Sequence, residues 1–266
     1  MIKLNNETVK ITRFPDNSIK FDLEKNFVQK VNEIVWRFES MEELFTLIGL
    51  LEKLKSTEVN LHLPYMPNAR MDKIQSNREG LMLKYFVKTL DNLGFNKITI
   101  LDPHSEVYKK WTKNTEWISD DELVKQLIEF TSNTIKNLEG KEVTYVYPDK
   151  GAKNRYSKLI GKPGLHGVKE RCQATGEILS FDIEGEIPDG PILIVDDICS
   201  KGGTFYFTAK KLREKGFTGN IYLHITHAEL TITEGELLKE DSEIKRVFTT
   251  DSILFQDIPK TTIYEL

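Results

Sequence analysis

The stretch ILIVDDICSKGGTF, from Ile192 to Phe205, begins with the apolar run of a buried strand and ends with the first residues of a helix. Between the two lie a pair of aspartates and a loop of Ser, Lys, Gly, Gly and Thr. Glycines let a loop turn tightly, and the N–H groups at a helix N-terminus bind phosphate, as do serine and threonine hydroxyls. The stretch therefore predicts a phosphate-binding turn between a strand and a helix.

The two aspartates, Asp196 and Asp197, stand directly before this turn. Their carboxylates can accept hydrogen bonds from the vicinal hydroxyls of a sugar whose 5-phosphate occupies the turn. The combination suits a ribose 5-phosphate, and the ligand-binding residues of the turn would be Cys199, Ser200, Lys201, Gly202, Gly203 and Thr204. The alternative is a plain strand-to-helix turn in which the aspartates only cap the helix.

Short β-rich runs alternate with amphipathic helical patterns along the rest of the chain. One of the helices has a capping box, Ser40 with Glu43, at its predicted start. Such alternation predicts an α/β protein with mainly parallel sheets flanked by helices, and with ligands beyond the carboxyl ends of the strands. The series runs twice, which predicts two similar domains, 1–139 and 140–266.

Composition narrows the range of partners. The chain has 266 residues, with 37 basic and 41 acidic side chains, a net charge of -4 and a pI near 5.9. This balance argues against general nucleic-acid binding, so any anion site must be local. No segment approaches the roughly 20 apolar residues that cross a bilayer, and the first residues lack the pattern of a signal peptide. We therefore expect a cytoplasmic protein that binds no membrane.

Polar motifs follow several of the predicted strands. They are FPDNS from Phe14, PYMPNARMDK from Pro64, DPHS from Asp102, PDKGA from Pro148, VDDICSKGGT from Val195 and THA from Thr226. The turn by itself resembles the phosphoribosyl-binding loop of type I phosphoribosyltransferase folds. In their order, the motifs resemble those of the ribose-phosphate diphosphokinases, or PRPP synthetases, over nearly the whole chain. The resemblance implies an N-terminal ATP-side domain and a C-terminal ribose-phosphate-binding domain, both phosphoribosyltransferase-like.

The resemblance also implies a reaction. Enzymes of this family bind ATP and Mg2+ between their two halves and transfer the β,γ-diphosphate of ATP to the C1 hydroxyl of ribose 5-phosphate, which gives PRPP and AMP. Their role is in nucleotide biosynthesis. By analogy, we expect a homo-oligomer with composite ATP sites.

Residue roles follow from the resemblance where the letters match. ATP would be bound by Phe14, Asp16, Arg70, Met71, Asp72 and His104, and Phe14 would stack on adenine in a neighbouring subunit. The metal would be held near Asp102, His104 and Asp149, of which Asp149 would also lie near the ribose. Structural roles remain alternatives for these residues. A lone Arg or His at a strand end is often only a surface group. Phe14 could be a core residue, and Asp149 could only form a turn.

The segment VKERCQATGEI, from Val168 to Ile178, resembles the mobile catalytic loop of the family. There, Lys169 and Arg171 would close over the transferring group. Phosphoryl transfer depends on positioning and on stabilising the charge that spreads over phosphate oxygens, which cations on a lid can supply. The resemblance thus implies that Lys169 and Arg171 are the catalytic residues.

The departures from the family motifs concern the substrates. Met71 stands where Gln is common, Ser18 where Glu is common, and Lys201 adds a cation to a turn that usually carries one more carboxylate. The chain is also short, and resembles compact bacteriophage forms, some of which are thought to pyrophosphorylate ADP-ribose in an NAD-salvage route in the host cytoplasm. ADP-ribose is therefore an alternative acceptor. A phosphoribosyltransferase that consumes PRPP and a non-catalytic regulatory homologue are further alternatives.

Overall fold

The structure is a computed structural model that describes all residues except 24–27, 75–77 and 172–177. The chain divides into two compact units, Met1–Asp120 and Asp121–Leu266. The sequence-based division after residue 139 differs from this by one helix, α3 (Asp121–Glu139), which belongs to the second unit. The reason is packing: Thr131 of α3 lies 2.9 Å from the Nδ1 atom of His224, a residue of the second unit.

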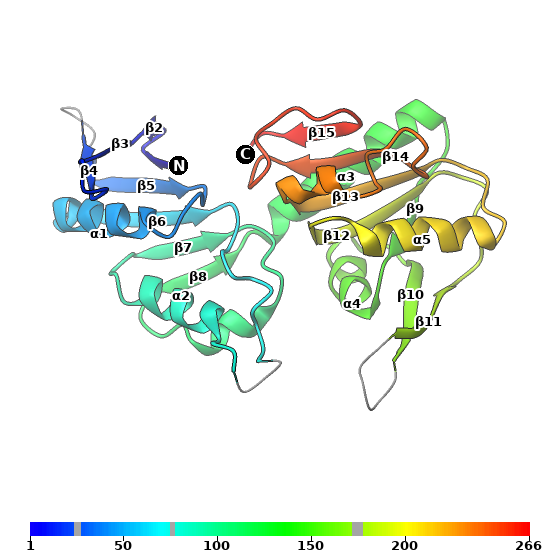
Figure 1. Ribbon diagram of the computed structural model, residues 1–266, viewed down its shortest axis with the longest axis horizontal. Helices are drawn as coiled ribbons and strands as arrows, with labels where there is room; N and C mark the ends of the chain where they lie inside the picture. Colours follow the sequence, from blue (N-terminus) through cyan, green and yellow to red (C-terminus); the bar gives the residue numbers. More distant parts are fainter. Residues whose placement is uncertain (24–27, 75–77, 172–177) are drawn as a thin grey trace. The chain divides into compact units, whose positions relative to one another are not determined.

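The first unit is built on a six-stranded sheet with the strand order β2-β1-β5-β6-β7-β8 (Figure 1). Its strands are β1 (Ile2–Leu4), β2 (Glu7–Thr8), β5 (Val31–Trp36), β6 (Glu58–Leu63), β7 (Lys97–Ile100) and β8 (Glu116–Ser119). β5 to β8 run parallel, whereas β1 pairs antiparallel with both of its neighbours. The connecting elements are α1 (Glu43–Leu54), α2 (Met82–Asp91) and the short 3-10 helix η1 (Glu106–Lys110), and a separate hairpin is formed by β3 (Lys10–Arg13) and β4 (Ile19–Asp22).

The second unit has a seven-stranded sheet with the order β11-β10-β9-β12-β13-β14-β15. Its strands are β9 (Thr144–Tyr147), β10 (Gly164–Arg171), β11 (Ile178–Glu184), β12 (Ile192–Cys199), β13 (Ile221–Ala228), β14 (Ile244–Thr250) and β15 (Thr261–Tyr264). Only β11 is antiparallel to its neighbour. The remaining elements are α4 (Lys150–Leu159), α5 (Gly203–Glu214) and η2 (Leu230–Glu234). The predicted α/β class with mainly parallel sheets is confirmed in both units.

Helices cover both faces of the second sheet. Leu223 and Ile225 of β13 belong to the apolar cluster that also contains Phe205 and Leu212 of α5. His224, which lies between them on β13, contacts α3 instead. Because successive side chains of a strand point to opposite faces, α3 and α5 cover opposite faces of this sheet. This buries β13 completely and leaves the ends of the strands as the accessible edge.

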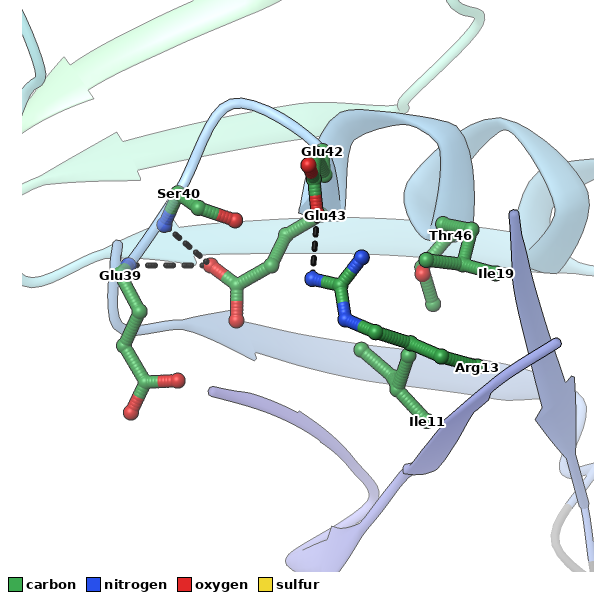
Figure 2. A pocket seen from close by; sticks show the side chains of 8 residues that line it. All are labelled: Ile11, Arg13, Ile19, Glu39, Ser40, Glu42, Glu43 and Thr46. Carbon is green, nitrogen blue, oxygen red and sulfur yellow. Dashed lines mark hydrogen bonds and ion pairs between the residues drawn. The ribbon is translucent and has the colours of Figure 1, made fainter. Parts of the chain in front are cut away.

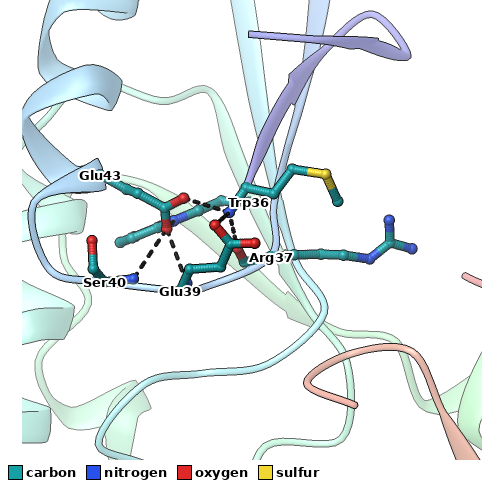
Figure 3. A network of polar contacts seen from close by, with 6 residues as sticks. Trp36, Arg37, Glu39, Ser40 and Glu43 are labelled. Carbon is teal, nitrogen blue, oxygen red and sulfur yellow. Dashed lines mark hydrogen bonds and ion pairs between the residues drawn. The ribbon is translucent and has the colours of Figure 1, made fainter. Parts of the chain in front are cut away.

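The start of α1 differs from the predicted capping box. The side chain of the N-cap residue, Glu42, makes no capping hydrogen bond to the helix. The buried carboxylate of Glu43 instead accepts hydrogen bonds from the Trp36 indole at 2.8 Å, the Glu39 N–H at 3.0 Å and the Ser40 N–H at 3.4 Å (Figure 3). It also binds the ammonium group of Met1. Burial would raise the pKa of Glu43, but these donors outweigh burial and lower it. Glu43 therefore joins β1, β5 and α1.

No helix in the described part of the chain has both the length and the apolar content that a membrane span requires.

Candidate functional site

The order of the strands reverses between β9 and β12 in the second unit. The chain leaves β9 through α4 toward β10 on one side, and it leaves β12 through α5 toward β13 on the other. β9 and β12 are parallel neighbours, so their carboxyl ends meet at one edge of the sheet. In open α/β sheets, ligands bind beyond the carboxyl ends at such a reversal. The structure places Asp149, Asp196 and Asp197 there.

Asp149 has a structural role in this edge. It is the N-cap of α4, and its Oδ1 atom accepts hydrogen bonds from the N–H groups of Gly151 at 2.9 Å and Ala152 at 3.1 Å. This is the turn-forming role expected of an aspartate before Lys-Gly, and a negative charge at a helix N-terminus also interacts favourably with the helix dipole. Any ligand contact of Asp149 must therefore come in addition to the cap.

The carboxylate of Asp196 carries the clearest electrostatic signal of the site. Burial raises its pKa well above the usual value, and the nearby carboxylates of Asp197 and Asp149 raise it further. Asp197 is itself 6% exposed, and its N–H donates a hydrogen bond to Oδ1 of Asp196 at 3.0 Å. Three acidic groups are thus held close together, of which Asp197 is buried and Asp149 and Asp196 are half-buried. Groups held at such a cost occur most often where a ligand binds.

The predicted phosphate turn connects β12 to α5. Gly202 has a φ of 76° and is the N-cap of α5, and a Cβ atom there would overlap the side chain of Leu237, so two independent constraints require glycine. A Cβ on Gly203 would meet nothing within 4 Å, and Thr204 is exposed. The N-terminus of α5 therefore faces open space, as a phosphate-binding turn requires.

One predicted residue of the turn lies elsewhere. The side chain of Cys199 is 1% exposed and belongs to the apolar core of the second unit, where its thiol donates a hydrogen bond to the Ser200 carbonyl at 3.3 Å. Cys199 ends a buried strand, and its side chain points into the core rather than toward the surface of the turn. Ser200 is half-buried, and Lys201 is exposed.

In the first unit, the motif FPDNS forms the turn of the β3–β4 hairpin. Asp16 accepts hydrogen bonds from the hydroxyl of Ser18 at 2.6 Å and from its N–H at 3.0 Å, and these two bonds lower the pKa of Asp16. Ser18, which replaces a common Glu, thus closes the turn. Phe14 is 52% exposed, so the plainer reading of Phe14 as a core residue is wrong.

A pocket of about 200 Å³ lies beside this hairpin (Figure 2). An ion pair between Arg13 and Glu42 links the hairpin to the start of α1. The pocket is lined by Ile11, Arg13, Ile19, Glu39, Ser40, Glu42, Glu43 and Thr46. It contains none of the residues that the sequence assigns to a ligand.

The other predicted residues of the first unit lie at one edge of its sheet, because they follow the parallel neighbours β6 and β7. After β6, Arg70 and Met71 are exposed and Asp72 is half-exposed. After β7, Asp102 has a φ of 43° and is fully buried, whereas His104 is exposed. The edge therefore presents Arg70 and His104 to solvent, and Asp102 lies beneath it.

Comparisons with known proteins find similar enzymes of one kind. No family model matches the chain. The ribose-phosphate pyrophosphokinase of Staphylococcus haemolyticus is 26% identical over 259 residues, which cover 94% of this chain and 78% of the relative. That of Bacillus subtilis is 26% identical over 252 residues, or 91% of this chain and 76% of the relative.

A solved structure, the phosphoribosylpyrophosphate synthetase of Mycobacterium smegmatis, matches with a TM-score of 0.71 and 18% identity, and covers 97% of this chain and 86% of that one. Over most of its length, the chain is similar to ribose-phosphate pyrophosphokinases. The resemblance found in the strand-end motifs is confirmed over nearly the whole length. The predicted fold class is confirmed by the same structure.

The similarity to ribose-phosphate pyrophosphokinases raises the question of whether the residues present could hold a metal ion. No group of three or more His, Cys, Asp or Glu side chains in the described ranges is arranged to hold a metal ion. Mg2+ needs no such group, because it keeps several waters and is commonly bound by one or two carboxylates together with substrate phosphates. Of the residues predicted to hold the metal, Asp102 in the first unit and Asp149 in the second carry the oxygen donors that this cation prefers. The donor set therefore fits Mg2+ that arrives with a nucleotide.

The likeness to ribose-phosphate pyrophosphokinases implies that Lys169 and Arg171 are the catalytic residues. Both belong to strand β10. In the β10–β11 hairpin, Lys169 stands opposite Phe181 and Arg171 opposite Ile178, with an irregularity in register just before Arg171. The rest of the predicted mobile loop, residues 172–177, falls outside the described residues. The two residues thus belong to the end of a β-hairpin rather than to a free loop.

Sequence reasoning overlooked the segment after β13. Its motif THA was noted, but the residues that follow it, Glu229–Leu237, pack against the phosphate turn. The only signal in the sequence was their position after the end of a strand of the same sheet.

Proposed function

We propose that this chain is an ATP-dependent pyrophosphokinase that transfers the β,γ-diphosphate of ATP to the C1 hydroxyl of ribose 5-phosphate, releasing AMP. The observation that carries this proposal is the aspartate pair, half-buried Asp196 and buried Asp197, beside an open phosphate turn at the strand-order reversal. The whole-length similarity to ribose-phosphate pyrophosphokinases supports it.

The proposed roles divide between the two units. The turn Ser200–Thr204 binds the 5-phosphate through the N–H groups of α5, and Asp196 and Asp197 orient the sugar hydroxyls. Arg70 and His104 bind the phosphates of ATP, and exposed Phe14 stacks on adenine. In the reaction, the C1 oxygen forms a bond to the β-phosphorus, the bond from that phosphorus to the α,β-bridging oxygen breaks, and the hydroxyl proton is lost to solvent.

Charge stabilisation completes the proposal. Mg2+, held near Asp102, His104 and Asp149, would neutralise charge on the ATP phosphates. Lys169 and Arg171 stabilise the charge that develops on the transferring group.

The metal requirement is testable. Chelation with EDTA is expected to abolish AMP release, because unshielded ATP repels an approaching hydroxyl oxygen and stabilises its own leaving group poorly. Readdition of Mg2+ should restore the reaction, as measured by chromatographic detection of AMP. Full activity in metal-stripped buffer would exclude Mg2+ and the metal roles of Asp102, His104 and Asp149.

A second acceptor, ADP-ribose, is favoured by one observation. Lys201 is exposed beside open space at the turn, where a cation suits a diphosphate that extends from C5. This activity would yield ADP-ribose 1-pyrophosphate and belong to an NAD-salvage route. We extend the proposal to a bacteriophage origin, with the enzyme in the host cytoplasm, and to a homo-oligomer in which Phe14 serves a neighbouring subunit.

The deciding experiment incubates the purified protein with ATP and Mg2+ together with ribose 5-phosphate or ADP-ribose. We expect AMP release that depends on one of the two acceptors, and the higher kcat/KM identifies the natural one. Consumption of PRPP with a base, without AMP formation, would indicate a phosphoribosyltransferase instead. No turnover in any of these assays would indicate a non-catalytic homologue.

A further inference from the structure

The segment Glu229–Leu237 follows β13 and lies along the phosphate turn. Its first N–H group, that of Glu229, donates a hydrogen bond to the carbonyl of Cys199 at 2.8 Å. Near its other end, Gly235 approaches the turn so closely that a Cβ atom there would overlap the carbonyl oxygen of Lys201. The segment therefore contacts the backbone of the turn at two points.

An apolar contact fixes a third point. The side chain of Leu237 is fully buried and occupies the space where Gly202 would carry a Cβ atom. Because Gly202 also has a left-handed backbone conformation, the shape of the turn and the position of Leu237 depend on each other. The segment Glu229–Leu237 is thus a rigid support for the turn.

Two side chains of this segment reach the polar groups of the turn. The hydroxyl oxygens of Thr231 and Ser200 are 3.0 Å apart, and the Thr231 hydroxyl is 3.4 Å from a carboxylate oxygen of Glu229. Thr231 can therefore accept a hydrogen bond from Ser200, or donate one to it when Ser200 donates to a phosphate. In both cases the Ser200 hydroxyl keeps its place.

The second contact is an ion pair. The ammonium group of Lys201 lies 2.8 Å from a carboxylate oxygen of Glu234, and the two side chains are 65% and 54% exposed. Exposed pairs of this kind are weak and exchange partners easily. Glu234 nevertheless offsets part of the charge that Lys201 would otherwise offer to an anion on the turn.

We propose that Thr231 and Glu234 are positioning residues of the acceptor site: Thr231 orients the Ser200 hydroxyl toward the acceptor phosphate, and Glu234 holds Lys201 back from it. The inference rests on the proposed function, in which this turn binds the acceptor phosphate. It implies opposite effects, since loss of the Thr231 hydroxyl removes an orienting contact whereas neutral Glu234 releases a cation.

Thr231→Val tests the first half. The KM for the better acceptor is expected to rise about fivefold to tenfold, the usual cost of one misplaced hydrogen bond, while kcat and the KM for ATP change less than about twofold. Thr231→Ser restores the hydroxyl and should restore the KM. Thr233→Val is the matched control, because the Thr233 hydroxyl donates only to the Leu230 carbonyl within the same segment. Equal KM values for Thr231→Val and Thr233→Val would overturn this half.

Glu234→Gln tests the second half. The KM for the acceptor is expected to fall about threefold at low ionic strength, and the gain should shrink as salt is added. In a Lys201→Met background the same change should have no effect, because the cation that it releases is gone. Glu236→Gln is the control, since Glu236 pairs with Lys239 rather than with the turn. An unchanged or raised KM in Glu234→Gln would overturn this half.

Calorimetric binding of ribose 5-phosphate separates this inference from the proposed function. If the wild-type protein releases no AMP but the variants still bind in the expected order, the positioning roles stand and the proposed reaction fails. If the wild-type protein releases AMP but the variants bind like their controls, the reaction stands and the positioning roles fail. Absence of binding by the wild-type protein would overturn the positioning roles regardless of AMP release.

Discussion

Alanine in place of Lys169 or Arg171 is expected to lower kcat at least about a hundredfold, or roughly 3 kcal/mol of transition-state stabilisation. In the proposed reaction, negative charge spreads over the oxygens of the transferring diphosphate, and a cation positioned against it acts mainly in the transition state. The apparent KM values should therefore change much less than kcat. Steady-state AMP release with varied ATP and acceptor measures both.

Folding should be unaffected by these two changes. The segment VKERCQATGEI contains little apolar content for a core, and alanine keeps the backbone groups that pair β10 with β11. The melting temperature without ligand is expected to shift by less than about 2 °C. Lys158→Ala, at an exposed position of α4, is the control for loss of a nearby cation. Near-normal turnover in both variants would remove the hairpin from the mechanism, and loss of folding would give the two residues a structural role.

The sequence could predict which residues lie at the carboxyl ends of the parallel strands. Asp149 and Asp196 are far apart in the chain, yet each follows or ends an apolar run, and parallel strands bring such ends to one edge. The raised pKa of Asp196, which Asp149 helps to cause, shows that the two carboxylates are close. The left-handed Gly202 was equally readable, because Gly-Gly before a helix pattern predicts a tight turn.

Other features depend on packing that no local pattern specifies. An amphipathic pattern predicts α3 but not the sheet that it covers, so it could not show that α3 packs with the second unit. The contact between Ser200 and Thr231 joins two loops with no characteristic spacing. A short motif reveals neither the burial of Asp102 beside an exposed His104 nor the left-handed backbone of Asp102.

Asp196→Asn is expected to raise the stability of the protein and to lower its activity toward the acceptor. The raised pKa of Asp196 means that the folded protein holds this proton more tightly than the unfolded chain, so raising the pH above the usual aspartate pKa costs the folded state stability. Asparagine removes that cost and keeps an oxygen to accept the Asp197 N–H. The melting temperature without ligand should therefore rise by at least about 2 °C at pH 8. The difference should shrink as pH falls, and vanish below the usual aspartate pKa, where the wild-type carboxyl is protonated in both states.

Acceptor use should change in the opposite direction. Loss of the charge weakens the hydrogen bonds from the sugar hydroxyls, and kcat/KM for the acceptor is expected to fall at least about a hundredfold, while the Kd of ATP changes less than about twofold. Asp189→Asn, at an exposed position of the same unit, should alter neither property. A lower melting temperature in Asp196→Asn would mean that its carboxylate is structural, and an altered ATP Kd would mean that it does not belong to the acceptor side. The expected combination of a more stable protein with a lost acceptor would show that the fold tolerates the unfavourable position of this carboxyl because the sugar requires it.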